Sequence, residues 1–342
     1  MITRFYSVRF LIPMLALTAI GGAAIAAENP YLGAWELTLP GPAAGWLEVR
    51  ETGGKLEASL MWIAGSVEPV TSVKLEPHRL ALMREHVVEH KDASGKMVKR
   101  TLPENISVTV EGDELKGLSI KLADNGRGEE KTAFTGKRTP PMPPAPTSSD
   151  VRFGPPVRLF NGKDLNGWRL TDSKADNGWS VRDGLLVNNN IQEEGKPHKH
   201  FGNLRTDSEF DDFDLKLEVR VPENGNSGIY LRGIYEVQVE DNYGKQPTTH
   251  SIGAIYSRIQ PTSNPCKPAG QWQSFDITLL HRHVTVVLNG TKVIDNQPVA
   301  GCTGGALWSD VSRPGPIYLQ GDHTSVEYRN IVLRPIISKA RD

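Results

Sequence analysis

Short segments in which apolar and polar residues alternate run through almost the whole 342-residue chain, and they constrain its fold more than any other feature. Examples are "LGAWELTL" near the start, "SGIYLRG" in the middle and "VEYRNIVLRP" near the end. A period of two places successive side chains on opposite faces of a strand, and Gly, Pro, Asn or Asp separates most of these segments. Helical periodicity is nearly absent. The sequence therefore predicts an all-β protein.

A proline-rich segment divides the chain. Residues 138–156, "RTPPMPPAPTSSDVRFGPP", contain seven prolines among 19 residues, which predicts an extended, semi-rigid linker. Before it, residues 28–140 predict a small antiparallel barrel or sandwich with tight hairpins at Gly53-Gly54 and Gly112-Asp113. After it, residues 157–340 predict a two-sheet sandwich or jelly roll. We expect the two parts to fold independently, because prolines do not continue a shared strand network.

The first residues have the form of a targeting segment. Arg4 and Arg9 precede an apolar run from Phe10 to about Ile20, and residues 24–26, Ala-Ile-Ala, have the small-x-small form that signal peptidase accepts. The sequence therefore predicts a secretory signal peptide at residues 1–26, with an uncleaved anchor as the alternative. We expect a periplasmic or extracellular protein with no membrane span in the mature chain. The net charge is -1, and positively and negatively charged residues are interspersed along the chain. No basic stripe therefore indicates nucleic acid as a partner.

Two cysteines, Cys266 and Cys302, are present in the chain. An oxidising compartment permits a disulfide between them, and we predict this bond. The closed loop would hold 37 residues, worth about 4 kcal/mol in the chain-entropy model. Two unrelated buried thiols are the alternative. Two cysteines without a nearby histidine do not make a zinc site.

A series of motifs after the linker resembles one known family. "LFNGKDLNGW", "WSVRDGLL", "GNSGIYLRGIYEVQVED", "QWQSFDITL", "VVLNGTKVID" and "IYLQGDHTSVEYRNIVLRP" occur in this order across about residues 157–336. Together they resemble the 3-keto-disaccharide hydrolase family, formerly a domain of unknown function. The resemblance implies a concanavalin-like jelly roll that acts on glycosides oxidised to a ketone at sugar carbon 3. Residues 28–140 lie outside it, so their role stays open.

The implied chemistry differs from that of an ordinary glycosidase. A ketone at C3 acidifies the hydrogen on C2, so a base can remove it, and the resulting enolate expels the group on C1. Addition of water completes a net hydrolysis, whereas an earlier stop gives a lyase outcome. Such a site needs a base within reach of C2–H and donors or a metal for the enolate oxygen. The sequence has no Gly-x-Gly-x-x-Gly nucleotide-binding unit, so a separate sugar 3-oxidoreductase is expected to supply the ketone.

The hairpin "GNSGIYLRGIYEVQVED" holds the first group of candidate residues. Period two places Glu236 and Gln238 on one face of a strand, which we expect to line a concave sheet. Arg232 precedes them and would bind the ketone oxygen, while Asn226 builds the preceding turn. Asp241 ends the strand and is a candidate acid or ligand. A solvated strand face with an internal Arg–Glu pair is the alternative.

The segment "LQGDHTSVEYRN" holds the second group. The resemblance places family positions on Gln320 and His323, and histidine suits proton transfer near neutral pH or metal ligation. No cofactor is certain, and a divalent metal held by Glu236 and His323 is left open. Trp272 and Tyr256 are candidates for stacking on a sugar, with packing in the core as the alternative.

Two functions from other classes compete with the enzyme. One is a non-catalytic carbohydrate-binding module, because the same sandwich serves lectins. The other is a surface or periplasmic adhesion protein. Ionisable residues clustered in one place favour catalysis, since binding alone needs only aromatic platforms and amides.

Overall fold

The structure is a computed structural model that describes residues 29–41, 43–91, 96–123, 128–147 and 151–337. The predicted signal peptide, residues 1–26, lies outside the described residues. The described residues from Tyr31 onward form one compact unit, and the regular elements among them are all β-strands. Among the described residues, no helix is long and apolar enough to cross a membrane. The all-β prediction is confirmed.

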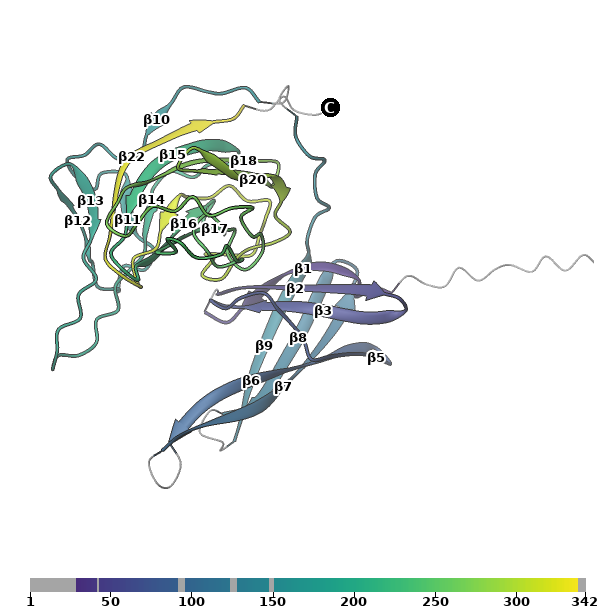
Figure 1. Ribbon diagram of the computed structural model, residues 1–342. Helices are drawn as coiled ribbons and strands as arrows, with labels where there is room; N and C mark the ends of the chain where they lie inside the picture. Colours follow the sequence, from purple (N-terminus) through teal and green to yellow (C-terminus); the bar gives the residue numbers. More distant parts are fainter. Residues whose placement is uncertain (1–28, 42, 92–95, 124–127, 148–150, 338–342) are drawn as a thin grey trace, which may run out of the picture. The chain divides into compact units, whose positions relative to one another are not determined.

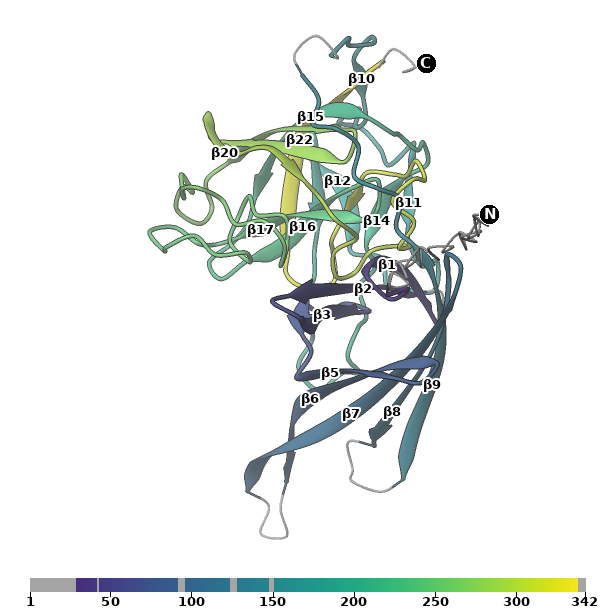
Figure 2. The ribbon, with the colours of Figure 1, turned by 90° about the vertical axis from the view of Figure 1, so that its right-hand side faces the viewer.

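The first part of the unit is one nine-stranded antiparallel sheet, in the order β4-β3-β2-β1-β9-β8-β7-β6-β5 (Figures 1 and 2). The Val70 N–H donates to Ala58 O at 2.9 Å and the Thr71 N–H donates to Met83 O at 2.7 Å, so the chain between the edge strands joins both edges. We call this part the N-terminal barrel. Its strands are β1 (Gly33–Leu39), β2 (Ala43–Thr52), β3 (Lys55–Trp62), β4 (Glu68–Pro69), β5 (Ser72–Glu76), β6 (Arg79–Lys91), β7 (Met97–Glu111), β8 (Glu114–Leu122) and β9 (Glu129–Arg138).

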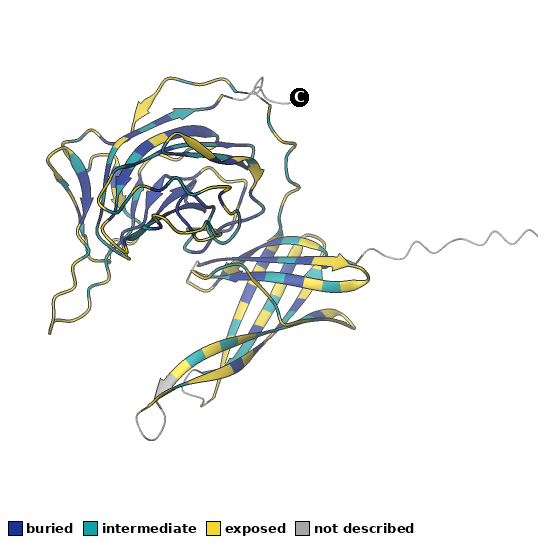
Figure 3. Ribbon diagram, viewed as in Figure 1, coloured by how far each residue is buried: buried dark blue, intermediate teal, exposed yellow. Residues whose placement is uncertain are grey.

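The alternation of the sequence places one face of each barrel strand inside. Trp35, Leu37 and Leu39 of β1 are buried in the barrel core, and Figure 3 shows buried and exposed residues alternating along the strands. The hairpin predicted at residues 53–54 is confirmed: both glycines have positive φ, +58° and +77°, between the paired residues Thr52 and Lys55. A two-residue turn of this type matches the twist of its strands.

The second part, residues 157–336, is a sandwich of two antiparallel sheets. The larger sheet has the order β12-β13-β22-β15-β18-β19-β20, with β10 paired to β22, and the smaller has the order β11-β14-β21-β16-β17. The larger sheet consists of β10 (Val157–Arg158), β12 (Trp179–Arg182), β13 (Leu185–Asn188), β15 (Phe213–Arg220), β18 (Gln273–Leu280), β19 (His283–Leu288), β20 (Thr291–Pro298) and β22 (Val326–Pro335). The smaller consists of β11 (Trp168–Leu170), β14 (Leu204–Thr206), β16 (Asn226–Leu231), β17 (Tyr235–Glu240) and β21 (Tyr318–Leu319).

The core of this jelly roll lies between its two sheets. Leu215 and Leu217 of β15 and Leu231 and Val237 of the smaller sheet are completely buried or nearly so, in one apolar cluster. Because β16 and β17 bury one face here, their other face is free to build a site. The Asn289-Gly290 hairpin is also confirmed, with φ of +50° and +81°.

The proline-rich linker contacts the jelly roll and forms no strand over residues 139–147. Arg282 Nη1 donates to Pro140 O at 2.9 Å, and Asn296 Nδ2 donates to Pro146 O at 3.1 Å. The jelly-roll core also contains Ala44, Trp46 and Met61 from the barrel strands. Independent folding of residues 28–140 and 157–340 stays a prediction, and these shared core residues argue against it.

The structure contradicts the predicted disulfide. Cys266 and Cys302 are both free and buried. Cys302 Sγ lies 3.8 Å from Gly45 O, whereas Cys266 Sγ lies 3.3 Å from Lys267 O. Burial raises the pKa of the Cys302 thiol to about 12, so it packs as a neutral, unreactive side chain. An even number of cysteines in a chain does not by itself bring them together.

Candidate functional site

A cavity of about 190 Å³ opens on the face of the smaller sheet that is turned away from the core. It is lined by six of the residues predicted from the sequence: Asn226, Glu236, Gln238, Tyr256, Gln320 and His323. Strands β16, β17 and β21 form its floor, and loops bring the remaining side chains. The structure therefore brings these six together, and their chemical roles stay predictions.

The pairing of β16 with β17 sets the floor of the cavity. Tyr230 lies opposite Glu236 and Gly228 lies opposite Gln238, so all four point to the cavity face. A Cβ atom at residue 228 would lie 2.4 Å from Glu236 Oε1. Glycine is therefore needed at position 228 to let the Glu236 carboxyl lie flat over the neighbouring strand.

Glu236 is an almost completely buried carboxyl group. Its side chain is 4% exposed, and burial raises its pKa from 4.5 to about 8, although the hydrogen bond from Tyr230 opposes the shift. With its NH2 group turned toward acceptors, the Gln238 carboxamide donates to Glu236 Oε1 at 3.0 Å and to Ser227 O at 3.3 Å. The carboxyl group is thus held at both oxygens and carries a proton at neutral pH.

The contacts of Tyr230 agree with a neutral Glu236. The Tyr230 hydroxyl lies 2.9 Å from Glu236 Oε2 and 2.8 Å from Gly304 O, but it has one proton to donate. When Glu236 is protonated, it donates to the Tyr230 oxygen, and Tyr230 donates to Gly304 O. When Glu236 is ionised, Tyr230 donates to Glu236 Oε2 instead, and this hydrogen bond is the one that lowers the pKa of Glu236. The Tyr318 ring stacks on Tyr230 with centroids 3.9 Å apart, and its hydroxyl donates to Gly305 O at 2.9 Å.

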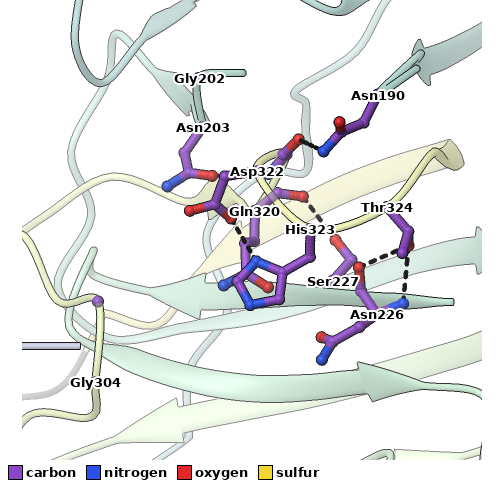
Figure 4. Close-up of polar contacts among 12 residues, drawn as sticks. Asn190, Gly202, Asn203, Asn226, Ser227, Gly304, Gln320, Asp322, His323 and Thr324 are labelled. Atoms are coloured by element: carbon purple, nitrogen blue, oxygen red, sulfur yellow. Dashed lines mark hydrogen bonds and ion pairs between the residues drawn. The ribbon is translucent and has the colours of Figure 1, made fainter. Parts of the chain in front are cut away.

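His323 lies at the mouth of the same cavity, paired with Asp322 (Figure 4). Its Nδ1 is 2.7 Å from Asp322 Oδ1, and this hydrogen bond raises the pKa of His323 above its ordinary value of 6.5. Asp322 therefore fixes the imidazole orientation and favours its charged form. Both His323 and Asp322 are exposed, unlike the carboxyl group of Glu236 below them.

Carboxamide groups surround the acid and the histidine. Gly321 N–H donates to Asn203 Oδ1 at 2.7 Å, which leaves the NH2 group of Asn203 toward the cavity (Figure 4). Among the described residues, Gln320 Oε1 is buried without a hydrogen-bond partner. Such an orphaned acceptor is costly unless a ligand or water donates to it. The backbone of Asn226 is fixed by Thr324, whose Oγ1 accepts from Asn226 N–H at 2.8 Å.

Arg232 does not lie in the cavity, which corrects the prediction that it binds the ketone oxygen. Its guanidinium donates to Val311 O at 2.7 Å and to Arg313 O at 2.6 Å, and Asp211 lies 3.3 Å away. The alternation of β16 ends at Leu231, because Arg232 has a left-handed φ of +55° in the turn to β17. The alternation of β16 therefore does not extend to Arg232.

Asp241 and Trp272 also lie elsewhere. The Asp241 carboxylate accepts the Asn224 N–H at 3.0 Å and closes the turn before β16, so it is neither an acid nor a ligand of this cavity. Trp272 precedes β18 of the larger sheet, where Arg220 and Arg329 lie 4.8 Å and 4.1 Å from its ring centroid. Its predicted stacking on a sugar in the same site is corrected accordingly.

Several lining residues were missed in the sequence. Tyr230 and Tyr318 alternate with core residues in "SGIYL" and "IYLQ", so period two could have placed them beside Glu236 and Gln320. Asn203 and Ala64 come from loops far away in the chain, and nothing in the sequence placed them there.

Two further features bear on the site. No group of three or more His, Cys, Asp or Glu side chains in the described part of the chain is arranged to hold a metal ion, so a divalent metal at Glu236 and His323 stays a prediction.

A larger cavity of about 350 Å³ lies on the other sheet. Its one lining carboxylate among the described residues, Glu327, pairs with Arg220 and lies 3.5 Å from Arg182, so this cavity offers no unpaired carboxylate as an acid or base.

Comparisons with known proteins show what the chain is similar to. A protein named 3-keto-disaccharide hydrolase from Bacteroides thetaiotaomicron is 26% identical over 167 residues, which is 41% of this chain and 57% of that protein's length. The chain thus spans little more than half of that relative. The structure of a glycosyl hydrolase candidate from Parabacteroides distasonis matches with 30% identity, 56% and 92% coverage and a TM-score of 0.43.

A second solved structure is more distant. The endo-beta-1,3(4)-glucanase SCLam matches with 11% identity, coverage of 58% of this chain and 95% of that chain, and a TM-score of 0.35. The family described as 3-keto-alpha-glucoside-1,2-lyase-like domain matches residues 155–334, just over half of the 342 residues and the whole jelly roll up to the last residues of β22. By this match the chain belongs to the 3-keto-alpha-glucoside-1,2-lyase-like domain family.

Proposed function

We propose that the chain is an exported enzyme that cleaves 3-keto-glycosides by removing the C2 proton, eliminating the group on C1 and adding water. The observation that carries this proposal is a buried carboxyl group, Glu236, in a cavity whose mouth holds His323 paired with Asp322. Two proton-carrying groups in different environments are what an elimination needs, one as base and one as acid. Membership of the family supports the substrate class.

The residues have distinct roles in this mechanism. The ionised form of Glu236 takes the proton from C2, and its raised pKa makes it a stronger base than an ordinary carboxylate. Protonated His323 donates its proton to the leaving oxygen as the C1–O bond breaks. The NH2 groups of Asn203 and Asn226 are donors for the enolate oxygen at C3, a task that the sequence had assigned to Arg232.

The later steps close the reaction. Elimination leaves a C1=C2 double bond conjugated with the ketone. Water adds its oxygen to C1 and gives up one proton to His323, which is neutral after protonating the leaving group. A proton returns to C2 from Glu236, so both side chains regain their starting forms and no oxidant or reductant is consumed. A separate sugar 3-oxidoreductase supplies the ketone. Release of the unsaturated sugar before hydration is the lyase outcome.

Incubation of purified protein with a 3-keto-glucoside that carries a chromogenic leaving group tests the proposal. We expect release of the chromophore and none from the corresponding glucoside without the ketone, because only the ketone acidifies C2–H. Parallel reactions with a chelator and with added divalent metals decide whether an ion takes part. Absence of release under every metal condition would favour a carbohydrate-binding module instead.

The pH dependence of this reaction should follow Glu236. Its ionised fraction grows about tenfold per pH unit below the pKa of about 8. The value of kcat/KM should therefore rise with pH as long as His323 keeps the proton that it donates to the leaving group. Tyr230→Phe removes a hydrogen bond that lowers the pKa of Glu236, so the rising limb should move to higher pH. Initial rates at low substrate concentration from pH 5 to 9 measure both curves. A limb centred near pH 4.5 in the wild type would contradict Glu236 as the base.

A further inference from the structure

The N-terminal barrel takes part in the wall of the cavity. The loop between β3 and β4, residues 63–67, places Ala64 among the lining residues. On one side, Ile63 O accepts the Gly305 N–H at 3.3 Å, and on the other the Val67 N–H donates to Ser257 Oγ at 2.7 Å. We call residues 63–67 the barrel loop. It belongs to a part of the chain outside the family match at residues 155–334.

The barrel loop also contacts Tyr256, another lining residue. Ser66 Oγ lies 2.9 Å from His250 Nε2 and 3.4 Å from the Tyr256 hydroxyl. The His250 ring meets the Tyr256 ring edge to face, with centroids 4.7 Å apart. One hydroxyl of the barrel therefore orients the aromatic residue on this side of the cavity.

The close approach of the barrel loop depends on a glycine. A Cβ atom at residue 304 would lie 2.6 Å from Gly65 O and 2.7 Å from Ala64 O, so Gly304 leaves room for the loop backbone. The same segment supports the carboxyl group, because Glu236 N–H donates to Thr303 Oγ1 at 3.0 Å. Residues 303–305 thus contact both Glu236 and the barrel loop.

The contact around the barrel loop is well packed. Arg258 lies over the ring of Trp46 in β2, 4.3 Å from its centroid, and donates to Cys302 O at 2.8 Å. Trp46 is 2% exposed and is part of the jelly-roll core. A cation over the face of a tryptophan ring is attracted to it, so this pair stabilises the contact between β2 and the jelly roll.

We propose that the barrel loop determines specificity for the group attached to C1 of the sugar. The reacting ring must reach Glu236 at the closed floor of the cavity, so the group on C1 leaves through the mouth. Ala64 is exposed at that mouth, and Tyr256 beside it is partly exposed. Because this inference rests on the proposed function, it concerns the leaving group of a 3-keto-glycoside.

Enlarging Ala64 tests the inference. We expect Ala64→Phe to lower kcat/KM for a 3-keto-disaccharide by about 10- to 200-fold, the range that small changes in pocket size produce. The reaction of methyl 3-keto-glucoside, whose leaving group is small, should lose much less rate than the reaction of the disaccharide. Ala64→Leu gives a smaller step in the same direction. Ala133→Phe is the matched control, because Ala133 is exposed on β9 and does not line the cavity.

The outcomes separate the two proposals. Wild-type protein that cleaves neither substrate would contradict the proposed function itself. Active wild type with Ala64→Phe and Ala64→Leu unchanged on both substrates would overturn only the role of the barrel loop. An equal loss on both substrates would also overturn it, because selectivity for the leaving group would be missing. Thermal unfolding of each variant shows whether a loss of rate comes from a loss of folded protein.

Discussion

Glu236→Gln is expected to lower kcat/KM on a 3-keto-glucoside by about 10²–10⁴, the contribution of a general base. The carboxamide has nearly the shape of the protonated carboxyl group, and Tyr230 and Gln238 can still contact it. It cannot accept a proton from C2, however. Rates under conditions of low substrate concentration measure the loss directly, and binding of the substrate should change much less.

The same substitution should not destabilise the fold. In the wild type, the unfolded chain ionises at Glu236 near pH 4.5, whereas the folded chain holds the proton up to about pH 8. The wild-type free energy of unfolding therefore falls as the pH rises through this window. Glutamine has no such dependence, so the stability of Glu236→Gln relative to the wild type should improve from pH 5 to 8. Denaturant unfolding at several pH values tests the sign.

Glu240→Gln is the matched control for this experiment. It makes the same chemical change four residues further along β17, at a partly exposed position that does not line the cavity. Its rate and its pH dependence should equal those of the wild type. Full activity of Glu236→Gln, or an equal loss in both variants, would refute Glu236 as the base.

The regular part of the fold could be predicted from the sequence, because its rules are local. Period two placed Glu236 and Gln238 on one strand face, and Asn289-Gly290 marked its hairpin correctly. The candidate site was predictable as far as the strands extend. At Arg232 the backbone adopts a left-handed conformation and the alternation ends. The Arg232 side chain donates hydrogen bonds to carbonyl groups of another loop.

Contacts between distant segments could not be predicted in the same way. The two cysteines of the sequence, Cys266 and Cys302, predicted a disulfide, yet both are free and buried at separate places in the fold. Ala64 reaches the cavity only because Gly304 leaves space for a loop from about 240 residues earlier. Neither relation leaves a local pattern, since both depend on where packed sheets meet.

Leu231→Ala is expected to cost about 2–5 kcal/mol of unfolding free energy, as do other truncations of buried leucines. Leu231 is 0% exposed and belongs to the apolar cluster between the two sheets. Removing its branched end leaves a cavity that the surrounding side chains of this close-packed cluster fill only in part. Equilibrium unfolding in denaturant measures the loss. Leu75→Ala, the same change at a leucine that is 51% exposed on β5, should stay within about 0.5 kcal/mol of the wild type.

This core variant and Glu236→Gln make opposite predictions within a single hairpin. Leu231 and Tyr230 are adjacent in β16, but one faces the core and the other faces the cavity. Under conditions where Leu231→Ala is folded, its kcat should remain near the wild-type value, because the contacts of Glu236 lie on the other face of the sheet. A large fall in kcat at unchanged fold would mean that the floor of the cavity depends on the packing behind it. In that case the two faces of β16 and β17 would be energetically coupled, and the loss of rate in Glu236→Gln could not be assigned to proton transfer without a matching pH profile.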